Sequence, residues 1–301
     1  MKKTFQKTLI AAATGVALLS AVGTANTNSL LFPYFTTEAG NTSIVSLSGN
    51  DQLSVAPAET IHYVYNYGSS CTHFDGNGSM TANDLLQHSV ASVAAGGFGK
   101  VVASDASAPF YFPLKDYGFL TVSTKSTATA QISGDMIVYN PTAGIVTSYP
   151  GIDNAIVDTT GADEGNFNNL ADTNFNLSFY PTSLVTTSWY GVVTGDMNAA
   201  IAAGADWGGK VALGNGGGVY DNDENLNSGL KSKTVTCSSV ILPKDLMNTA
   251  QEATVGPNGG LIHATATPDA ATNATGLVMT KIQIVPAAKA GLLHREAAPA
   301  F

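Results

Sequence analysis

The sequence predicts an all-β protein: a mostly antiparallel β-sandwich with a few short helices in its connections. Three observations lead to this prediction. Short segments rich in β-branched and aromatic residues recur along the chain, Gly, Asn, Asp and Pro separate them, and helical periodicity is sparse. Strands that follow one another without helices between them are typical of a sandwich and not of a parallel α/β sheet.

The first 25 residues have the three parts of a secretory signal peptide. Three lysines precede an uncharged stretch at residues 9–22, and Gly23 and Ala25 are the small residues that a signal peptidase needs before its cut. The uncharged stretch is shorter than the roughly 20 apolar residues of a spanning helix, although an uncleaved membrane anchor is the alternative. We therefore expect a mature chain from Asn26 onward, secreted or at the cell surface, without a membrane-spanning segment.

Composition and charge exclude nucleic acid as a partner. The chain has 13 Lys and Arg against 22 Asp and Glu, and loss of the three signal-peptide lysines takes the net charge from −9 to −12. An acidic chain with a single arginine, Arg295, cannot neutralise a phosphate backbone. Charged residues are only 12% of the chain, about half the usual share. Thr, Ser, Asn, Gly and Ala replace them, as in extracellular β proteins.

The two cysteines, Cys71 and Cys237, are expected to form one disulfide, because a single pair in an oxidising compartment is usually bonded. In the chain-entropy picture, closing so long a loop stabilises the fold by up to about 4–5 kcal/mol. Two separate buried thiols are the alternative. The sequence contains no CxxC, CxxCH or HExxH motif, which excludes the haem and zinc sites that those motifs build.

About ten strands are expected from the local signals. Residues 42–47 alternate in part, and Ile61, Tyr63, Tyr65 and Tyr67 fall on one face of a period-two strand. The other expected strands are residues 98–104, 119–123, 128–139, 175–180, 210–213, 234–242, 261–265 and 277–285.

Three short helices are expected as connections packed on the sheets. They are residues 81–86, 197–203 and 244–252. The polar and acidic residues 151–174 predict a long surface loop or a seam between β units. We accordingly expect a first β unit at residues 26–150, and at residues 175–301 either a second unit or the continuation of one large sandwich.

Alternating oxygen-bearing side chains suggest a calcium site. Asp75, Asn77 and Ser79, followed by Asp84, resemble a loop of the EF-hand or dockerin kind, since calcium is bound by several hard oxygens around a tight turn. The spacing departs from that pattern, because Asp84 is the tenth residue counted from Asp75 and Met80 stands where the glycine belongs. The alternative is an Asx-rich turn that leads into a capped helix.

A second acidic run, at Asp221, Asp223 and Glu224, follows a triple glycine and offers carboxylates on a flexible loop. A solvated surface loop is the alternative. Ca²⁺ is the cofactor that these two runs suggest.

No catalytic motif is found, so we expect no enzymatic activity. GxSxG, P-loop and GxGxxG patterns are all absent from the sequence. A secreted hydrolase stays open as an alternative, because glycoside hydrolysis needs only two acids across a cleft. The aromatic residues at 110–112 and at Trp189 and Tyr190 suit either a sugar-stacking platform or the protein core.

One resemblance extends over about residues 30–140. The segment LLFPYF at residues 30–35, followed by GNTSIV at 40–45, resembles the start of certain uncharacterised secreted bacterial β-sandwich surface proteins. CTHFD at residues 71–75 and GFG at 97–99 are also similar to that group. The resemblance implies export and a sandwich fold, and it implies no activity.

The leading functional expectation is a structural protein of the cell surface or extracellular matrix, such as a subunit of a fibre, sheath or lattice. The low charge reduces repulsion between packed copies. After signal cleavage, Leu30, Leu31, Phe32, Tyr34 and Phe35 lie near the new N-terminus, where such an arm could add as a strand to a neighbouring subunit. The alternative for this segment is the first strand of the chain's own sandwich.

The second functional expectation is a secreted binding module for carbohydrate or another ligand, with calcium dependence and a surface polysaccharide as partner. It predicts a defined pocket or an aromatic platform.

Overall fold

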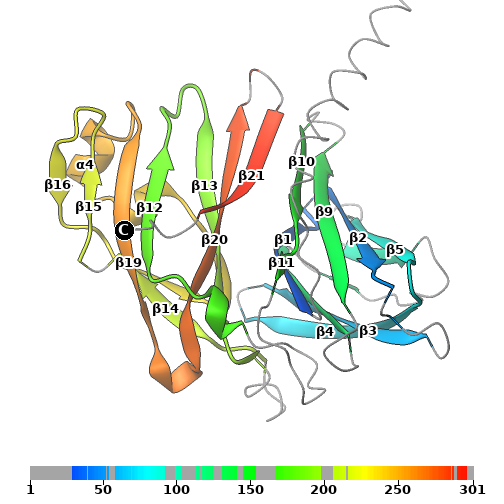
Figure 1. Cartoon of the computed structure of the whole chain (residues 1–301). Coiled ribbons are helices and arrows are strands. Elements are labelled where there is room, and N and C mark those ends of the chain that lie inside the picture. Colours follow the sequence, from blue (N-terminus) through cyan, green and yellow to red (C-terminus); the bar gives the residue numbers. More distant parts are fainter. Residues whose placement is uncertain are drawn as a thin grey trace, which may run out of the picture.

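The structure is a computed structural model of the whole chain, and two β lobes lie side by side in it (Figure 1). It describes residues 29–38, 40–51, 53, 58–68, 70–91, 99–103, 113–114, 117–124, 131–140, 145–153, 167–197, 206–214, 216–285, 287 and 290–296. The strands of this part of the chain form four sheets, and every pairing between them is antiparallel. The predicted all-β sandwich fold is confirmed.

The first lobe is a sandwich of two sheets. Its inner sheet, which faces the second lobe, consists of β1 (Ser29–Thr36), β3 (Glu59–Tyr67), β4 (Thr72–Met80), β8 (Tyr117–Thr124) and β11 (Ile152–Asp153). Its outer sheet consists of β2 (Thr42–Gly49), β5 (Leu85–Ala91), β6 (Gly99–Ala103), β7 (Pro113–Leu114), β9 (Ile132–Asn140) and β10 (Ile145–Pro150). The strand orders are β11-β1-β8-β3-β4 and β10-β9-β2-β5-β6-β7.

The second lobe is a sandwich of the same kind. Its inner sheet consists of β13 (Thr186–Gly195), β18 (Ser238–Ile241), β20 (Ala274–Val285) and β21 (Ala290–Glu296), in the order β18-β13-β20-β21. Its outer sheet consists of β12 (Asn174–Phe179), β14 (Lys210–Leu213), β15 (Gly218–Tyr220), β16 (Leu226–Ser228), β17 (Lys233–Thr236) and β19 (Gly260–Pro268). The order there is β16-β15-β19-β14-β17, and β12 also pairs with β19.

The inner sheet of the first lobe is buried on both faces. Leu30 and Phe32 of β1 belong to the core of the first sandwich, whereas Leu31 between them belongs to the core shared with the second lobe. In β8, Leu120 likewise belongs to the core of the first sandwich, and Phe119 belongs to the shared core. A strand that is covered on both faces has a nearly continuous apolar run and not an alternating one. This explains the uninterrupted LLFPYF at the start of the mature chain.

Most expected strands are confirmed, with boundaries that shift by a few residues. The confirmed strands are β2, β3, β6, β8, β9, β12, β14, β19 and β20. The expected strand at residues 234–242 is two strands, because the chain crosses from one sheet to the other at Cys237. β17 pairs with β14 in the outer sheet, and β18 pairs with β13 in the inner sheet.

The helix expected at residues 81–86 is wrong. A turn at residues 82–83 leads directly into strand β5. The side chains of this strand alternate, with Leu85 and Gln87 exposed and Leu86 and His88 buried. That period of two is the pattern of a half-buried strand, and it outweighs the weak capping signal before it.

The helical segment expected at residues 244–252 is present as two short helices, α3 (Pro243–Leu246) and α4 (Thr249–Thr254). Asn248 separates them, because its side chain accepts hydrogen bonds from the backbone N–H groups of Ala250 and Gln251 and so caps α4. The helix expected at residues 197–203 falls almost entirely outside the described residues. Among the helices in the described ranges, none has the length and apolar character that crossing a membrane requires.

Candidate functional site at the junction of the lobes

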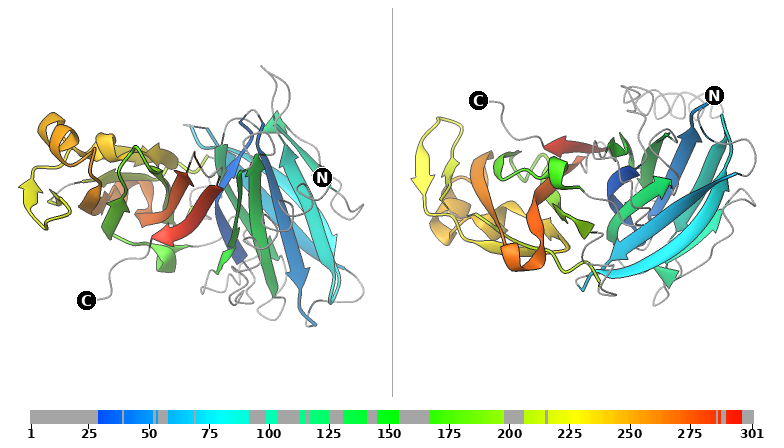
Figure 2. Two further views of the ribbon diagram at one scale, coloured as in Figure 1. Left: turned by 90° about the horizontal axis from the view of Figure 1, so that it is seen from above. Right: turned by 60° about the horizontal axis from the view of Figure 1, so that its bottom comes forward.

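A cluster of tyrosines joins the two lobes. Tyr190 of β13 lies with its ring centroid 5.1 Å from that of Tyr34 of β1 and 5.6 Å from that of Tyr117 of β8. Both contacts are edge-to-face, the arrangement that aromatic quadrupoles favour. Strand β21 of the second lobe also packs beside β10 of the first (Figures 1 and 2). The lobes therefore share one apolar interior and do not merely touch at a linker.

The hydroxyls of Tyr190 and of the neighbouring Tyr149 are hydrogen-bonded inside the protein. Tyr190 donates a hydrogen bond to Oγ of Ser238 at 2.6 Å. Tyr149 accepts one from the backbone N–H of Tyr34 at 3.1 Å and donates one to the carbonyl of the same residue. Burial raises the pKa of both Tyr190 and Tyr149 well above the usual tyrosine range. These tyrosines stay neutral at physiological pH and serve as packing groups.

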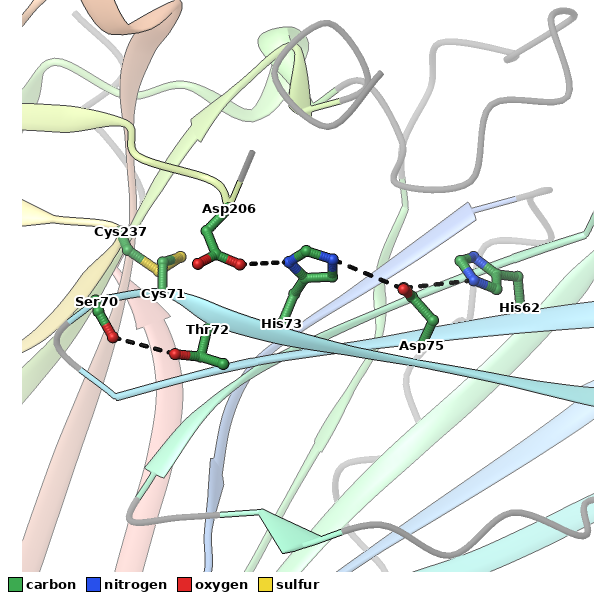
Figure 3. Close-up of polar contacts among 8 residues, drawn as sticks. All are labelled: His62, Ser70, Cys71, Thr72, His73, Asp75, Asp206 and Cys237. Carbon is green, nitrogen blue, oxygen red and sulfur yellow. Dashed lines mark hydrogen bonds and ion pairs between the residues drawn. A yellow bond between two sulfur atoms is a disulfide. The ribbon is translucent and has the colours of Figure 1, made fainter. Parts of the chain in front are cut away.

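The predicted disulfide between Cys71 and Cys237 is confirmed, and it links the two lobes (Figure 3). Cys71 lies in the turn between β3 and β4, and Cys237 lies at the crossing between β17 and β18. Their Cα atoms are 5.6 Å apart, and both residues are fully buried. The bond thus covalently joins a hairpin turn of one sandwich to a sheet corner of the other.

A row of histidine and aspartate side chains runs from the buried His62 to the exposed Asp206, next to the disulfide (Figure 3). Nδ1 of His73 lies 2.6 Å from Oδ1 of Asp206, which belongs to the second lobe. Nε2 of His73 lies 3.7 Å from Asp75, and Nε2 of His62 lies 3.6 Å from the same carboxylate. Since an ionised carboxylate only accepts hydrogen bonds, Nδ1 of His73 is the donor to Asp206.

This arrangement is suited to holding the lobes together and not to activating a nucleophile. Each ring nitrogen of His73 faces a carboxylate, so neither is directed at a hydroxyl that it could deprotonate. The two nearby hydroxyls drawn in Figure 3, of Ser70 and Thr72, are 3.1 Å apart and hydrogen-bond to each other. Within the described ranges, no three His, Cys, Asp or Glu side chains are grouped so as to hold a metal ion.

The first predicted calcium run does not form a loop. Asp75, Asn77 and Ser79 lie on the regular strand β4, which pairs with β3 along its whole length. They share one side of the strand, and alternate residues on a strand are about 7 Å apart, which is too far to surround a single ion. Asp84 lies beyond the strand, where its side chain accepts hydrogen bonds from the N–H groups of Thr81 and Leu85. Extended pairing with β3 has replaced the expected tight turn.

The second predicted run forms a turn that uses its own oxygens. Oδ1 of Asp221 accepts hydrogen bonds from the backbone N–H groups of Asp223 and Asn225, both at 2.9 Å. Hydrogen bonds from Asn225 lower the pKa of Asp221, and the bond from its side chain contributes more than the one from its backbone. Glu224 has a left-handed backbone conformation at φ 64° within this turn. Internal hydrogen bonds account for the arrangement, and calcium binding by either run stays a prediction.

The predicted assembly arm lies within the chain's own fold. Leu30, Leu31, Phe32 and Phe35 are at most 1% exposed, and Tyr34 contacts both cores. Strand β1 pairs with β8 on one side and with β11 on the other. The alternative given above, a first strand of the same sandwich, describes this segment correctly, and a free N-terminal arm does not.

Of the two alternatives for Trp189 and Tyr190, a sugar-stacking platform or the protein core, the core is confirmed. The two residues point to opposite faces of β13, and both side chains are fully buried, Trp189 in the second sandwich and Tyr190 at the junction. The other aromatic run, at residues 110–112, lies outside the described residues. No motif in the sequence marks the junction itself, although the adjacent Trp-Tyr pair on one strand is a sign of burial on both faces.

Five of the predicted site residues thus lie at the junction: Cys71, Cys237, Asp75, Leu31 and Tyr34. His62, His73 and Asp206, which were not predicted as site residues, lie there with them. Comparison with known protein families and with curated proteins finds no match to this chain.

Proposed function

We propose that the protein is an exported structural protein of the cell surface or extracellular matrix, in which two sandwiches act as one rigid, self-associating unit. The observation that carries this proposal is the covalent and apolar junction. A buried disulfide, a tyrosine cluster and a shared core fix the lobes relative to each other. A disulfide of this kind persists in an oxidising compartment, and rigidity between lobes is what a load-bearing or lattice-forming subunit requires.

Self-association has a candidate surface in strand β4. This nine-residue strand is the last in its sheet, and no described strand pairs with its outer edge. An unpaired edge offers N–H and C=O groups to a further strand. The side chains of Asp75 and Asn77 on it are exposed and polar, so a partner strand would add through backbone hydrogen bonds and not through an apolar face.

Negative-stain electron microscopy of the purified chain from Asn26 onward tests this proposal, with calcium and then with a chelator. We expect ordered fibres or sheets. The variant Asn77→Lys places like charges next to one another when two β4 edges meet and should abolish them, whereas the uncharged control Asn77→Ser should retain them. Loss of order in chelator would place a cation at the subunit contacts. Dispersed monomers of the wild type under both conditions would contradict self-assembly.

A second candidate function is a binding module for a surface polysaccharide. It is favoured by a pocket of about 330 Å³ at one end of the second sandwich. This candidate predicts retention of the dispersed protein on a polysaccharide column, independent of any fibre formation.

A further inference from the structure

We propose that strand β4 of one copy pairs with β4 of a second copy, antiparallel and about a two-fold axis at Asn77. This inference rests on the self-association proposed above, and it adds the partner and the register of the contact. A two-fold contact uses the same surface on both copies and closes at a dimer. The dimer is then the unit from which fibres or sheets are built through a second contact.

Strand β4 is the longest strand at the end of a sheet in the described part of the chain. It has nine residues and pairs with β3 residue by residue, without a register shift. The strands at the other sheet ends have two to seven residues, and two of the longer ones, β10 and β21, pack beside each other at the junction. Strand β4 also contains no Lys, Arg or Pro, with which proteins commonly protect an exposed edge. Its outer edge is therefore the one best suited to accept a further strand.

The junction of the lobes determines which part of β4 a partner can pair with. The disulfide and the contact of His73 with Asp206 place the second lobe beside the first residues of the strand (Figure 3). The stretch beyond these contacts, residues 74–80, has Asn77 as its midpoint. A second copy of β4 that pairs over this stretch alone therefore has its two-fold axis at Asn77.

The residues that face each other in this register are compatible. Asn77 and Asp75 are exposed, and Ser79 lies on the same side of the strand. Asn77 faces Asn77 of the second copy, and the two amides can exchange hydrogen bonds. Asp75 faces Ser79, whose hydroxyl can donate to the carboxylate. An axis at Asp75 would instead place two carboxylates opposite each other, which is unfavourable. The remaining facing pairs are Gly76 with Gly78 and Phe74 with Met80.

Disulfide trapping of the full mature chain tests the register. The chain has only two cysteines and both are bonded, so a cysteine introduced on β4 is the single free thiol. Facing residues have Cα atoms about 4.5–5.5 Å apart, a distance that a disulfide can bridge. With a mild oxidant, Asn77→Cys should therefore form covalent dimers. Asp75→Cys alone and Ser79→Cys alone are matched controls, because each cysteine is then about 13 Å from its copy, but a mixture of these two variants should form heterodimers.

Exchange of charge at Asn77 is the second measurement. In sedimentation experiments, Asn77→Lys alone and Asn77→Asp alone should stay monomeric because like charges face each other, whereas their mixture should dimerise. Covalent dimers of Asp75→Cys alone, or none of Asn77→Cys, would overturn the proposed contact. If the wild type still forms fibres in that case, the proposed function stands without this contact. Trapped dimers of Asn77→Cys without fibres of the wild type would support the contact and contradict a fibre.

Discussion

His88 is a neutral histidine enclosed between the two sheets of the first sandwich. It lies on β5, 2% exposed, with its ring centroid 4.9 Å from that of Tyr63 in an edge-to-face contact. Its Nε2 contacts the hydroxyl of Tyr65. Burial lowers its pKa from 6.5 to about 3, because the charged imidazolium is poorly solvated there. The residue therefore couples folding to acidity.

The sign of the coupling follows from the two pKa values. The folded pKa of about 3 is below the unfolded value of 6.5, so the unfolded chain binds the proton first as the pH falls. The stability that neutral His88 contributes is complete above pH 6.5 and is lost as the pH falls toward 3, by about 1.4 kcal/mol per pH unit.

Replacement of His88 by glutamine should remove this pH dependence of stability, because the amide does not titrate and can still accept a hydrogen bond from Tyr65. Urea unfolding at pH 7, 5 and 4 measures the free energy of unfolding of both proteins. As the pH falls, the free energy of unfolding of the wild type should decrease more steeply than that of His88→Gln. The difference in slope should correspond to about one bound proton. Parallel curves for the two proteins would show that His88 stays uncoupled from the transition.

The two cysteines are in the left-handed backbone region, with φ 58° at Cys71 and φ 60° at Cys237. Residues other than glycine are costly there, by roughly 1–3 kcal/mol. At Cys71 this conformation closes the turn between β3 and β4, and at Cys237 it turns the chain from one sheet to the other. The disulfide offsets this conformational cost, because the two turns place its cysteines next to each other.

At the scale of elements, strand β1 organises the first lobe. It lies between β8 and β11 in the inner sheet and contributes apolar side chains to both cores. A segment used in this way is a structural strand, and its loss removes ladder hydrogen bonds and core packing together.

Deletion of residues 26–35 should therefore unfold the chain. We expect loss of the near-UV circular dichroism signal and of cooperative unfolding, because β8 would lose one of its two partner strands and the junction would lose Leu31 and Tyr34. Deletion of the C-terminal residues 297–301, which lie beyond β21, is the control. A folded but non-assembling product of the first deletion would instead restore the hypothesis of a free arm.

At the scale of the whole molecule, the disulfide joins parts that are 166 residues apart in sequence. A crosslink of that span restricts the unfolded chain strongly, and the chain-entropy model gives a stabilisation of about 5 kcal/mol. The double variant Cys71→Ala, Cys237→Ala should unfold at markedly lower urea than the oxidised wild type.

The wild type with reductant is the control for that experiment. Since both cysteines are fully buried, reductant should act slowly on the native protein and rapidly once urea opens it. Identical urea midpoints for the double variant and the oxidised wild type would contradict a stabilising role for the bond.

We expect the tyrosine cluster to make the two lobes unfold as one cooperative body. Tyr190→Ala removes two edge-to-face contacts and the hydrogen bond to Ser238, so we expect a loss of about 3–5 kcal/mol. Tyr190→Phe, which keeps both ring contacts, should cost only about 1 kcal/mol. Urea unfolding followed by probes in each lobe measures this. Two separated transitions in the wild type would mean that the lobes fold independently.

The sequence by itself determined the all-β class, most strand positions and the pairing of the only two cysteines. These features depend on local signals, namely period-two patterns, turn residues and a count of thiols. It left β1 open as either a free arm or a strand, and it did not predict β13. A strand that is buried on both faces lacks the alternation of apolar and polar residues that identifies strands.

Only the tertiary structure decided which polar residues meet. Asp75 and His73 are neighbours in sequence, but Asp206 comes from the other lobe, and no local pattern relates them. Local sequence fixes backbone conformation over a few residues, whereas a site is formed by packing between segments far apart in the chain.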